Sequence, residues 1–545
     1  MSVTKDSAGT AQAAISSNPN AIDGEEQNAT PYAWYGLSVL VVVYILNFID
    51  RQILSILAND IKADLNLTDA DLGFLYGTAF AVFYALFGIP LGKLADTWHR
   101  VRLMSLGLTI WSAMTALSGF ARDGATLTVA RIGVGVGEAT ASPSAYSLIS
   151  DWFPKRMRAT ALAIYSSGLY LGGGISLFIG AQVVERWNAA YSAETAPLGL
   201  AGWQAAFLVV GIPGLLLALV VLSLKEPVRG AIDGIPTPKV AQPFKGFFDE
   251  LLAVIPPFTL IGAARRGVSA LARNLAMALV LYGAARLLTD LTRVEGQWEW
   301  QGLSQQWLFL GLGWYAIYSW AASLRAKDPA TFALIWKNPA FLCVIMGYGC
   351  VAFGSYAGSY WAAPYAERIF GVHKTEIGWF VGGPGAIAGF LGVIMGGRMA
   401  DWLRVRNDAG RILVVAFGLL APIAPFVIAY TTTSSALFYV MHFIAAVFTS
   451  SALGAAAATT QDLVLPRMRG TATATFFLAT TLFGLALGPY MAGQVSTVTG
   501  NLATGIMSTL AVVPLGIVLL IAAYKLVPLA ERNATERARA AGEPI

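Results

Sequence analysis

The chain has 545 residues, of which 56% are hydrophobic and 12% charged, and its formal net charge is +5. Soluble domains carry about 25% charged residues, so this composition and a mean hydropathy of +0.62 indicate a membrane protein. The small positive charge argues against a nucleic-acid partner. Cys343 and Cys350 lie in one apolar segment, and the histidines have no metal-ligand spacing, so we expect no disulfide, metal or other cofactor.

The chain begins with a polar segment of small residues, 1–30, which we expect to be a disordered tail rather than a signal peptide. Twelve apolar segments follow, with lengths close to the roughly 20 residues that cross a hydrocarbon core. Helix is the expected conformation, because in lipid each backbone polar group must be satisfied within its own segment. The predicted spans are 35–58, 72–95, 103–121, 125–150, 159–184, 203–224, 338–365, 376–399, 411–430, 435–460, 470–496 and 502–525.

Segment 225–337 separates the sixth span from the seventh and contains two further apolar runs, 271–290 and 303–324. The Trp-bearing stretch 297–302 between these runs suits a membrane interface. We favour an inserted spanning hairpin; the alternative is a pair of interfacial amphipathic helices. A shorter run, 246–263, is predicted to be a surface helix.

Lysine and arginine in the short loops predict the orientation, because cytoplasmic loops carry an excess of these residues. Loops on the side of the N-terminus hold twelve of them, and loops on the other side hold five. We therefore expect both termini in the cytoplasm, with the chain in an inner (cell) membrane and residues 529–545 forming a basic tail.

The loop after the second span is repeated after the eighth. The two copies are Gly92, Asp96, Arg100 and Arg102, and Gly397, Asp401, Arg404 and Arg406. A second match, 156–161 with 467–472, follows the fourth and tenth spans, and the two offsets are 305 and 311 residues. The chain therefore consists of two related halves, 31–224 and 338–528.

A carboxylate beside arginines and a helix terminus can form a pair that breaks when the halves move, so these loops are candidate gates. The alternative is a static loop that only fixes topology.

These loops resemble the Gly-x-x-x-Asp loop motif of the major facilitator superfamily, although Thr97 and His99 stand where a basic residue and Gly are common. The first half is similar to the Spinster family of sphingolipid and lysolipid transporters in Asn-Phe-Ile-Asp-Arg (47–51), Gly-Val-Gly-Glu-Ala (135–139) and Asp-Trp-Phe-Pro (151–154). Organic-anion porters share parts of this pattern. The resemblance implies an all-α bacterial membrane protein with two six-helix bundles, here with the extra hairpin between them.

Ionisable residues inside spans are costly and are therefore functional candidates. The first span holds Asp50 and Arg51, and the fourth holds Arg131 and Glu138, which share one helix face. At 1.5 Å per residue, Asp50 and Arg131 lie about 12 and about 9 Å from the outer ends of their spans, and Glu138 lies about 20 Å in. The family resemblance implies that Asp50, Arg131 and Glu138 surround one aqueous chamber.

Burial and a neighbouring arginine have opposite effects on the proton affinity of a carboxylate. If Arg131 moves relative to Asp50 or Glu138 during transport, the proton affinity of that carboxylate changes, and we therefore expect proton coupling. The alternative is a charge network that only holds the helices together. Arg131 fits the head group of an anionic substrate equally well. Arg51 is expected to point away from Asp50, either as a second ligand or extended toward the membrane surface.

The second half is poor in buried charge, and its candidate cavity residues are polar or aromatic. They are Tyr356, Tyr360, Trp361, His442 and Thr449. Such an aromatic stripe is more often packing than a ligand wall, and a hydrogen-bonded structural histidine is more common than a pH-responsive one. A cavity with one charged and one apolar side would suit an amphiphile.

We therefore predict a monomeric secondary active transporter that works by alternating access, is coupled to protons and carries an amphiphilic, lipid-like (lysolipid- or sphingolipid-like) substrate across the bilayer. A proton-coupled organic-anion porter or a drug exporter is the alternative. A membrane receptor or sensor is a further alternative, but both tails are too short for a signalling domain. We expect no enzyme, because the sequence shows no nucleophile–base pair, metal cluster or nucleotide loop.

Overall fold

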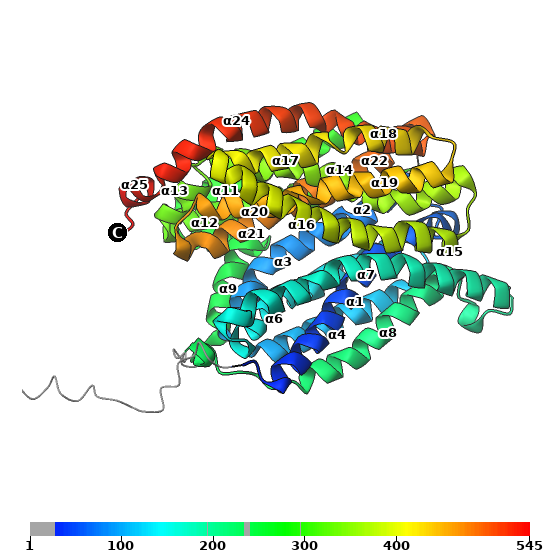
Figure 1. Cartoon of the computed structure of the whole chain (residues 1–545), viewed down its shortest axis with the longest axis horizontal. Coiled ribbons are helices and arrows are strands. Elements are labelled where there is room, and N and C mark those ends of the chain that lie inside the picture. Colours follow the sequence, from blue (N-terminus) through cyan, green and yellow to red (C-terminus); the bar gives the residue numbers. More distant parts are fainter. Residues whose placement is uncertain (1–27, 193, 234–239, 295, 545) are drawn as a thin grey trace, which may run out of the picture.

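The computed structural model describes residues 28–192, 194–233, 240–294 and 296–544, so most of the predicted tail 1–30 lies outside the described residues. Two bundles of long helices lie side by side, one from each half of the chain (Figure 1). Helix α1 begins and helix α24 ends at the same end of the bundles. We call this end the terminal end, which is on the left in Figure 1, and the other the opposite end.

The first bundle is built from the helices that precede the insert. They are α1 (Pro31–Asp64), α2 (Asp69–Tyr76), α3 (Thr78–Thr97), α4 (Arg100–Ser118), α5 (Gly124–Glu138), α6 (Ala141–Trp152), α7 (Lys155–Ala190) and α8 (Gly202–Leu222), with short turns η1 (Pro197–Gly199) and η2 (Ala231–Asp233). Polar caps start several of them: Thr30 accepts a hydrogen bond from the amide of Ala33, and Thr68 and Asp71 form a reciprocal capping box at α2.

The second bundle follows the insert and contains more broken helices. Its elements are α14 (Pro339–Phe370), α15 (Lys374–Ile377), η3 (Gly378–Gly382), α16 (Gly383–Arg406), α17 (Gly410–Leu420), α18 (Ile423–Thr431), α19 (Ser435–Ser450), α20 (Ala452–Asp462), η4 (Pro466–Met468), α21 (Arg469–Ala479), η5 (Thr480–Leu485), α22 (Gly488–Thr499), α23 (Leu502–Ser508), η6 (Thr509–Val512) and α24 (Val513–Arg532). The predicted tail 529–545 continues α24 and then forms α25 (Ala534–Ala540), whose Ala538 is buried.

In the described part of the chain, twelve helical segments are long and apolar enough to cross a membrane. They differ from the twelve predicted spans at one place. The predicted span 125–150 is divided into α5 and α6, because the ring of Pro143 would clash with the carbonyl group of Ala139 in a continuous helix. Its place among the twelve is taken by α11 (Val268–Thr292) of the insert.

The insert forms a helical hairpin close to the predicted positions. It consists of α9 (Pro243–Val254), α10 (Phe258–Arg265), α11, a two-stranded turn of β1 (Glu299–Trp300) and β2 (Leu303–Ser304), α12 (Gln305–Lys327) and α13 (Pro329–Ile335). The predicted single surface helix 246–263 is two short helices, α9 and α10, bent by 99°. Figure 1 shows α9 running crosswise at the terminal end. Whether the hairpin spans the bilayer stays a prediction, since α12 is not among the twelve apolar segments.

The hairpin contacts both bundles through α12. The side chain of Gln306 accepts a hydrogen bond from Thr78 of α3 at 2.6 Å and donates one to the carbonyl oxygen of Ala486 at 3.3 Å, next to η5. At the opposite end, Gln494 of α22 donates to the carbonyl oxygen of Thr292 at 2.5 Å. The two bundles also meet directly where a Cβ atom on Gly174 of α7 would lie 2.5 Å from the carbonyl oxygen of Gly382, so that only glycine permits this approach.

Candidate functional site

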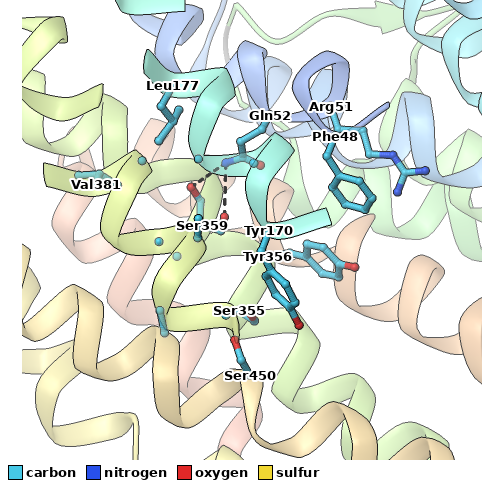
Figure 2. Close-up of a pocket in the computed structure, with 18 of the residues that line it drawn as sticks. Phe48, Arg51, Gln52, Tyr170, Leu177, Ser355, Tyr356, Ser359, Val381 and Ser450 are labelled. Carbon is cyan, nitrogen blue, oxygen red and sulfur yellow. Dashed lines mark hydrogen bonds between the residues drawn. The ribbon is translucent and has the colours of Figure 1, made fainter. Parts of the chain in front are cut away.

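A cavity of about 260 Å³ lies between the two bundles. Figure 2 shows the side chain of Gln52, from α1, reaching across to Ser359 of α14. The Gln52 amide donates to the backbone and hydroxyl oxygens of Ser359 at 3.2 and 3.4 Å, and its own oxygen accepts from the Tyr76 hydroxyl at 2.9 Å. The sequence analysis did not select these three residues, although a glutamine directly after Asp50 and Arg51 in an apolar span was a usable signal.

The two bundles give the cavity walls of different character. The first bundle contributes two arginines, Arg51 and Arg131, together with aromatic rings such as Phe48 and Phe80. The lining from the second bundle is mostly glycine, alanine and serine, with few large side chains, and the described lining residues from this bundle include no Asp, Glu, Lys or Arg. The cavity therefore has one cationic wall and one wall without formal charge.

Arg51 forms an ion pair with Glu138, which joins α1 to α5. The Nε atom of Arg51 lies 2.5 Å from Oε2 of Glu138, and the Glu138 side chain is fully buried. The Arg51 guanidinium also lies over the Phe80 and Tyr84 rings, 4.6 and 4.5 Å from their centres. Arg51 therefore does not extend toward the membrane surface; it lines the cavity with its charge balanced by Glu138.

Arg131 has no such carboxylate partner among the described residues. Its Nη1 donates to the backbone oxygen of Asp50 at 3.1 Å, while its Nε and Nη2 atoms are buried without a partner in the described chain. The residue is 1% exposed and lines the cavity. A buried guanidinium with free donors is costly, and an anion in the cavity would satisfy it.

The Asp50 side chain is also buried, at 2% exposed, but it is not among the lining residues. It lies near Trp111 and Thr115 of α4. One carboxylate oxygen of Asp50, the Trp111 Nε1 and the Thr115 hydroxyl have no hydrogen-bond partner in the described residues. The structure thus gathers Asp50, Arg131 and Glu138 inside the first bundle, and only Arg131 of the three reaches the cavity.

Two of the five candidates from the second half line the cavity, namely Tyr356 and His442. The other three lie outside its lining. Tyr360 stacks on Tyr76 with ring centres 4.2 Å apart, Trp361 donates to the carbonyl oxygen of Pro489 at 2.9 Å, and Thr449 donates to that of Ala445 at 2.8 Å. Packing and helix contacts account for these three side chains, as expected for most aromatic stripes.

A network of charged side chains joins the bundles at the opposite end. Asp69 accepts from Lys62 of its own bundle at 2.6 Å and, from the second bundle, from Arg368 at 2.8 Å and Ser496 at 2.6 Å. Asp69 is only 4% exposed, so these contacts are shielded from water. This cluster links the two bundles at the opposite end.

A second part of the same network surrounds Glu367. Its oxygens accept from Lys374 at 2.7 Å and from Asn59 of α1 at 2.6 Å, and Lys374 also lies 3.1 Å from Asp60. Sequence reasoning missed these residues because they lie in loops and helix ends of different halves, where only the tertiary structure shows which ones meet.

The candidate gating loops lie at the terminal end and form their ion pairs within their own bundle. Arg100 is fully buried and contacts Asp151 and Glu226, at 2.7 Å for the latter. In the second bundle, Arg404 pairs with Glu531, and Arg406 lies over Trp402 at 3.9 Å.

Asp96 lies near Lys93 and Arg229, and no hydrogen bond or ion pair of the described residues involves the exposed Asp401. A Cβ atom on Gly92 would make only an ordinary van der Waals contact, and one on Gly397 would meet open space. The backbone amide of Arg102 donates a hydrogen bond to the His99 side chain.

The structure also changes which arginines of the two halves are equivalent. Arg411, not Arg404, is the counterpart of Arg100, because Arg411 pairs with Asp462 as Arg100 pairs with Asp151, and both pairs are 51 residues apart. The offset between the two pairs is the 311 residues of the second sequence match. The same ion pair therefore fixes the start of one helix against the end of another in each bundle.

A family model described as Major Facilitator Superfamily matches residues 40–489. The chain belongs to the Major Facilitator Superfamily. This match confirms the predicted superfamily and fold class, and the Spinster relatives confirm the predicted likeness to that family. The chain is a multi-pass membrane protein and a secondary transporter, and membership of a transporter family supports a role other than that of an enzyme.

Among its relatives within the superfamily is an "MFS-type efflux pump" of Mycolicibacterium smegmatis, 25% identical over 474 residues, which cover 87% of each chain. The Drosophila melanogaster "Protein spinster" is 24% identical over 85% of this chain and 62% of its own length. A crystal structure of a bacterial homolog of the human lysosomal transporter Spinster, described as inward-facing and unoccupied, is 26% identical, with a TM-score of 0.64 and coverage of 94% of this chain and 99% of that one.

Proposed function

We propose that this transporter moves an amphiphilic anion with a lipid-like apolar part, such as a lysolipid, by proton-coupled alternating access. The observation that supports it most directly is the difference between the two cavity walls. Arg131 offers free hydrogen-bond donors and positive charge on one side, while the wall from the second bundle carries no formal charge among its described residues. An amphiphile needs both kinds of surface in one cavity.

The size of the cavity limits what it encloses. At about 260 Å³ it lies just below the usual range for ligand sites, roughly 300–1,000 Å³. It therefore suits a polar head group and the first part of an apolar chain rather than a whole long-chain lipid. In this proposal Arg131 binds the head group, because its Nε and Nη2 atoms have no other acceptor in the described residues.

The Arg51–Glu138 pair supports the proton-coupling part of the proposal. A proton on Glu138 would remove the charge that holds Arg51 and release the guanidinium toward the cavity that it already lines. Asp50 provides a second carboxyl group in the same bundle, next to unpartnered polar atoms of α4. Glu138 and an anionic substrate would then compete for Arg51, so that a proton on Glu138 favours substrate binding.

The contacts between the bundles at the opposite end support an alternating-access cycle in which this structure is the state closed at that end. Within the described residues, the ion pairs that join the two bundles, Arg368–Asp69 and Lys374–Asp60, both lie at that end. The charged loops of the terminal end pair within a bundle and are free to separate or approach with it. We propose that the terminal end faces the cytoplasm of a bacterial inner membrane, in line with the excess of basic residues there, and that the protein works as a monomer.

The test is transport by protein reconstituted into vesicles with an imposed pH gradient. We expect gradient-dependent movement of lysolipids, greater for those with an apolar chain than for a head group alone, and a loss of at least about tenfold with Arg131→Gln, which removes a charge-assisted contact. Tyr360→Phe serves as a control, because it removes a hydroxyl near the site that has no partner in the described residues. Movement of small hydrophilic acids alone would refute the lipid-like substrate.

That outcome would support the second candidate, a proton-coupled organic-anion porter. The free donors of Arg131 favour it as much as they favour a lysolipid, since a carboxylate binds a guanidinium through two oxygens. A drug exporter is the remaining alternative, and an efflux pump is among the relatives that match most of the chain. Transport of apolar cations with no effect of Arg131→Gln would identify that function.

A further inference from the structure

Three arginines lie at the corner where α10 is followed by α11, namely Arg265, Arg266 and Arg273. The sequence contains no Asp or Glu between Glu250 and Asp290, so no acidic residue is close to them along the chain. The structure brings none to them from elsewhere either: within the described residues, none of the three guanidinium groups takes part in an ion pair or a hydrogen bond.

Several arginines elsewhere at the terminal end do have acidic partners. Arg100, Arg404 and Arg411 each contact a carboxylate of their own bundle. Arg467 contacts two, Asp328 and Glu543. An excess of basic residues on one side of a membrane explains why arginines are present there, but it does not explain why three of them gather without acids.

Exposed apolar side chains surround the same corner. Phe258 and Ile261 of α10 are 43% and 50% exposed, and Val268, the first residue of α11, is 85% exposed. A segment that combines exposed apolar residues with unpaired basic ones is typical of the interface between lipid head groups and acyl chains. Helix α10 packs against α9, which runs crosswise at the terminal end (Figure 1).

The position of Arg273 defines the depth of this surface. It lies five residues into α11, about 7.5 Å from the first residue at 1.5 Å per residue. Exposed Leu279 and Val280 follow on the same helix. An unpaired arginine on a helix with such an apolar surface extends its guanidinium back to the phosphates at the membrane surface.

We propose that Arg265, Arg266 and Arg273 form a binding site for the phosphate groups of anionic phospholipids in the leaflet at the terminal end. The apolar side chains of Phe258, Ile261 and Val268 contact the adjoining acyl chains. The site is separate from the central cavity and its ligand is a bilayer lipid that stays bound, not a transported substrate. Its effect is to hold the corner between α10 and α11, and with it α9, at the membrane surface.

The experiment compares two full-length variants in detergent. In the first, Arg265, Arg266 and Arg273 are each replaced by Gln. In the control, three exposed basic residues of the terminal end without ion-pair partners in the described chain, Lys155, Arg469 and Lys525, are replaced by Gln. Both variants lose the same charge. Binding of phosphatidylglycerol and of phosphatidylcholine is measured by native mass spectrometry, together with the thermal stabilisation that each lipid provides.

We expect the control to retain phosphatidylglycerol binding and the first variant to lose it by at least about tenfold, as expected for several basic residues at a lipid surface. Phosphatidylcholine should bind both proteins equally. Equal phosphatidylglycerol binding by both variants, or equal loss in both, would overturn the site, as would full competition by inorganic phosphate. If the first variant does not fold, the single change Arg273→Gln, at an exposed position, is tested in its place with the same expectation.

A lipid in the central cavity is distinguished by Arg131→Gln. This variant should retain phosphatidylglycerol binding at the corner even if it loses transport. Failure of the corner site and failure of the proposed transport function therefore give different results.

Discussion

The Nε atom of Arg51 and the Oε2 atom of Glu138 lie 2.5 Å apart, and this ion pair joins α1 to α5 beside the central cavity. In Glu138→Gln the carboxylate is lost while the volume is kept, so Arg51 becomes free to enter the cavity. We expect proton-driven uptake by reconstituted protein to fall by at least about tenfold, because a buried charge partner is lost, whereas exchange of substrate without a gradient persists. Asp50→Asn tests the second carboxyl group in the same assay. Unchanged gradient dependence in both variants would exclude these two residues from coupling.

The contact between Asp69 and Arg368 should stabilise closure of the opposite end. Asp69→Asn removes the charge that binds Lys62 and Arg368, and we expect the fraction of molecules open at that end to increase about tenfold or more, since hydrogen bonds to charged groups contribute about 1.5–3 kcal/mol. Distances between spin labels at the exposed positions Glu194 and Thr433, measured by electron paramagnetic resonance, report this change.

Asp123→Asn is the control for that experiment. Asp123 also lies at the opposite end, but it caps α5 within one bundle, and Asn can keep the cap. An equal change of the distance distribution in both variants would mean that Asp69 has no specific role in closure.

The repeated ion pairs differ in burial and should differ in their contribution to stability. Arg100 is fully buried against Asp151 and Glu226, so Arg100→Met leaves two carboxylates unpaired and should cost about 3–5 kcal/mol of stability. Arg411 pairs with an Asp462 side chain that is 34% exposed, so Arg411→Met should cost about 1 kcal/mol or less. Thermal unfolding of the purified variants provides the comparison, and equal losses would refute this interpretation of burial.

Gln306 should be important for attachment of the hairpin. Gln306→Leu removes its bonds to Thr78 and Ala486 and should lower stability by about 1–3 kcal/mol. Limited proteolysis at residues 225–337 is the measurement, and faster cleavage there than in wild type is the expected result. Gln305→Leu, one residue earlier on α12, is the matched control and should leave the cleavage rate unchanged.

Asp328 links the end of α12 to Arg467, and hydrogen bonds from the Arg467 guanidinium lower the pKa of Asp328 from 3.8 to about 2. A lowered pKa means that the pair contributes stability above about pH 4, and that this contribution is lost as the pH falls toward 2. Asp328→Asn should therefore lower the melting temperature equally at about pH 5.5 and about pH 8, where Asp328 is ionised in both states. A loss confined to one of these pH values would contradict the assignment.

The sequence by itself determined the membrane fold, its two related halves and the residues of the first bundle that carry charge. Apolar segments of spanning length can only be helices in lipid, and charges within them are rare enough to select Asp50, Arg51, Arg131 and Glu138 individually. The prediction of one continuous fourth span was wrong, because the apolar pattern continues across the position where Pro143 divides the helix.

Only the tertiary structure decided which partners these residues have. The sequence placed Arg51 beside Asp50, but the helix turns its guanidinium to Glu138, 87 residues away. The same holds for Asp69 and Arg368, which are 299 residues apart. Ion pairs between distant segments depend on how helices pack, and composition or spacing within one segment contains no information about that packing.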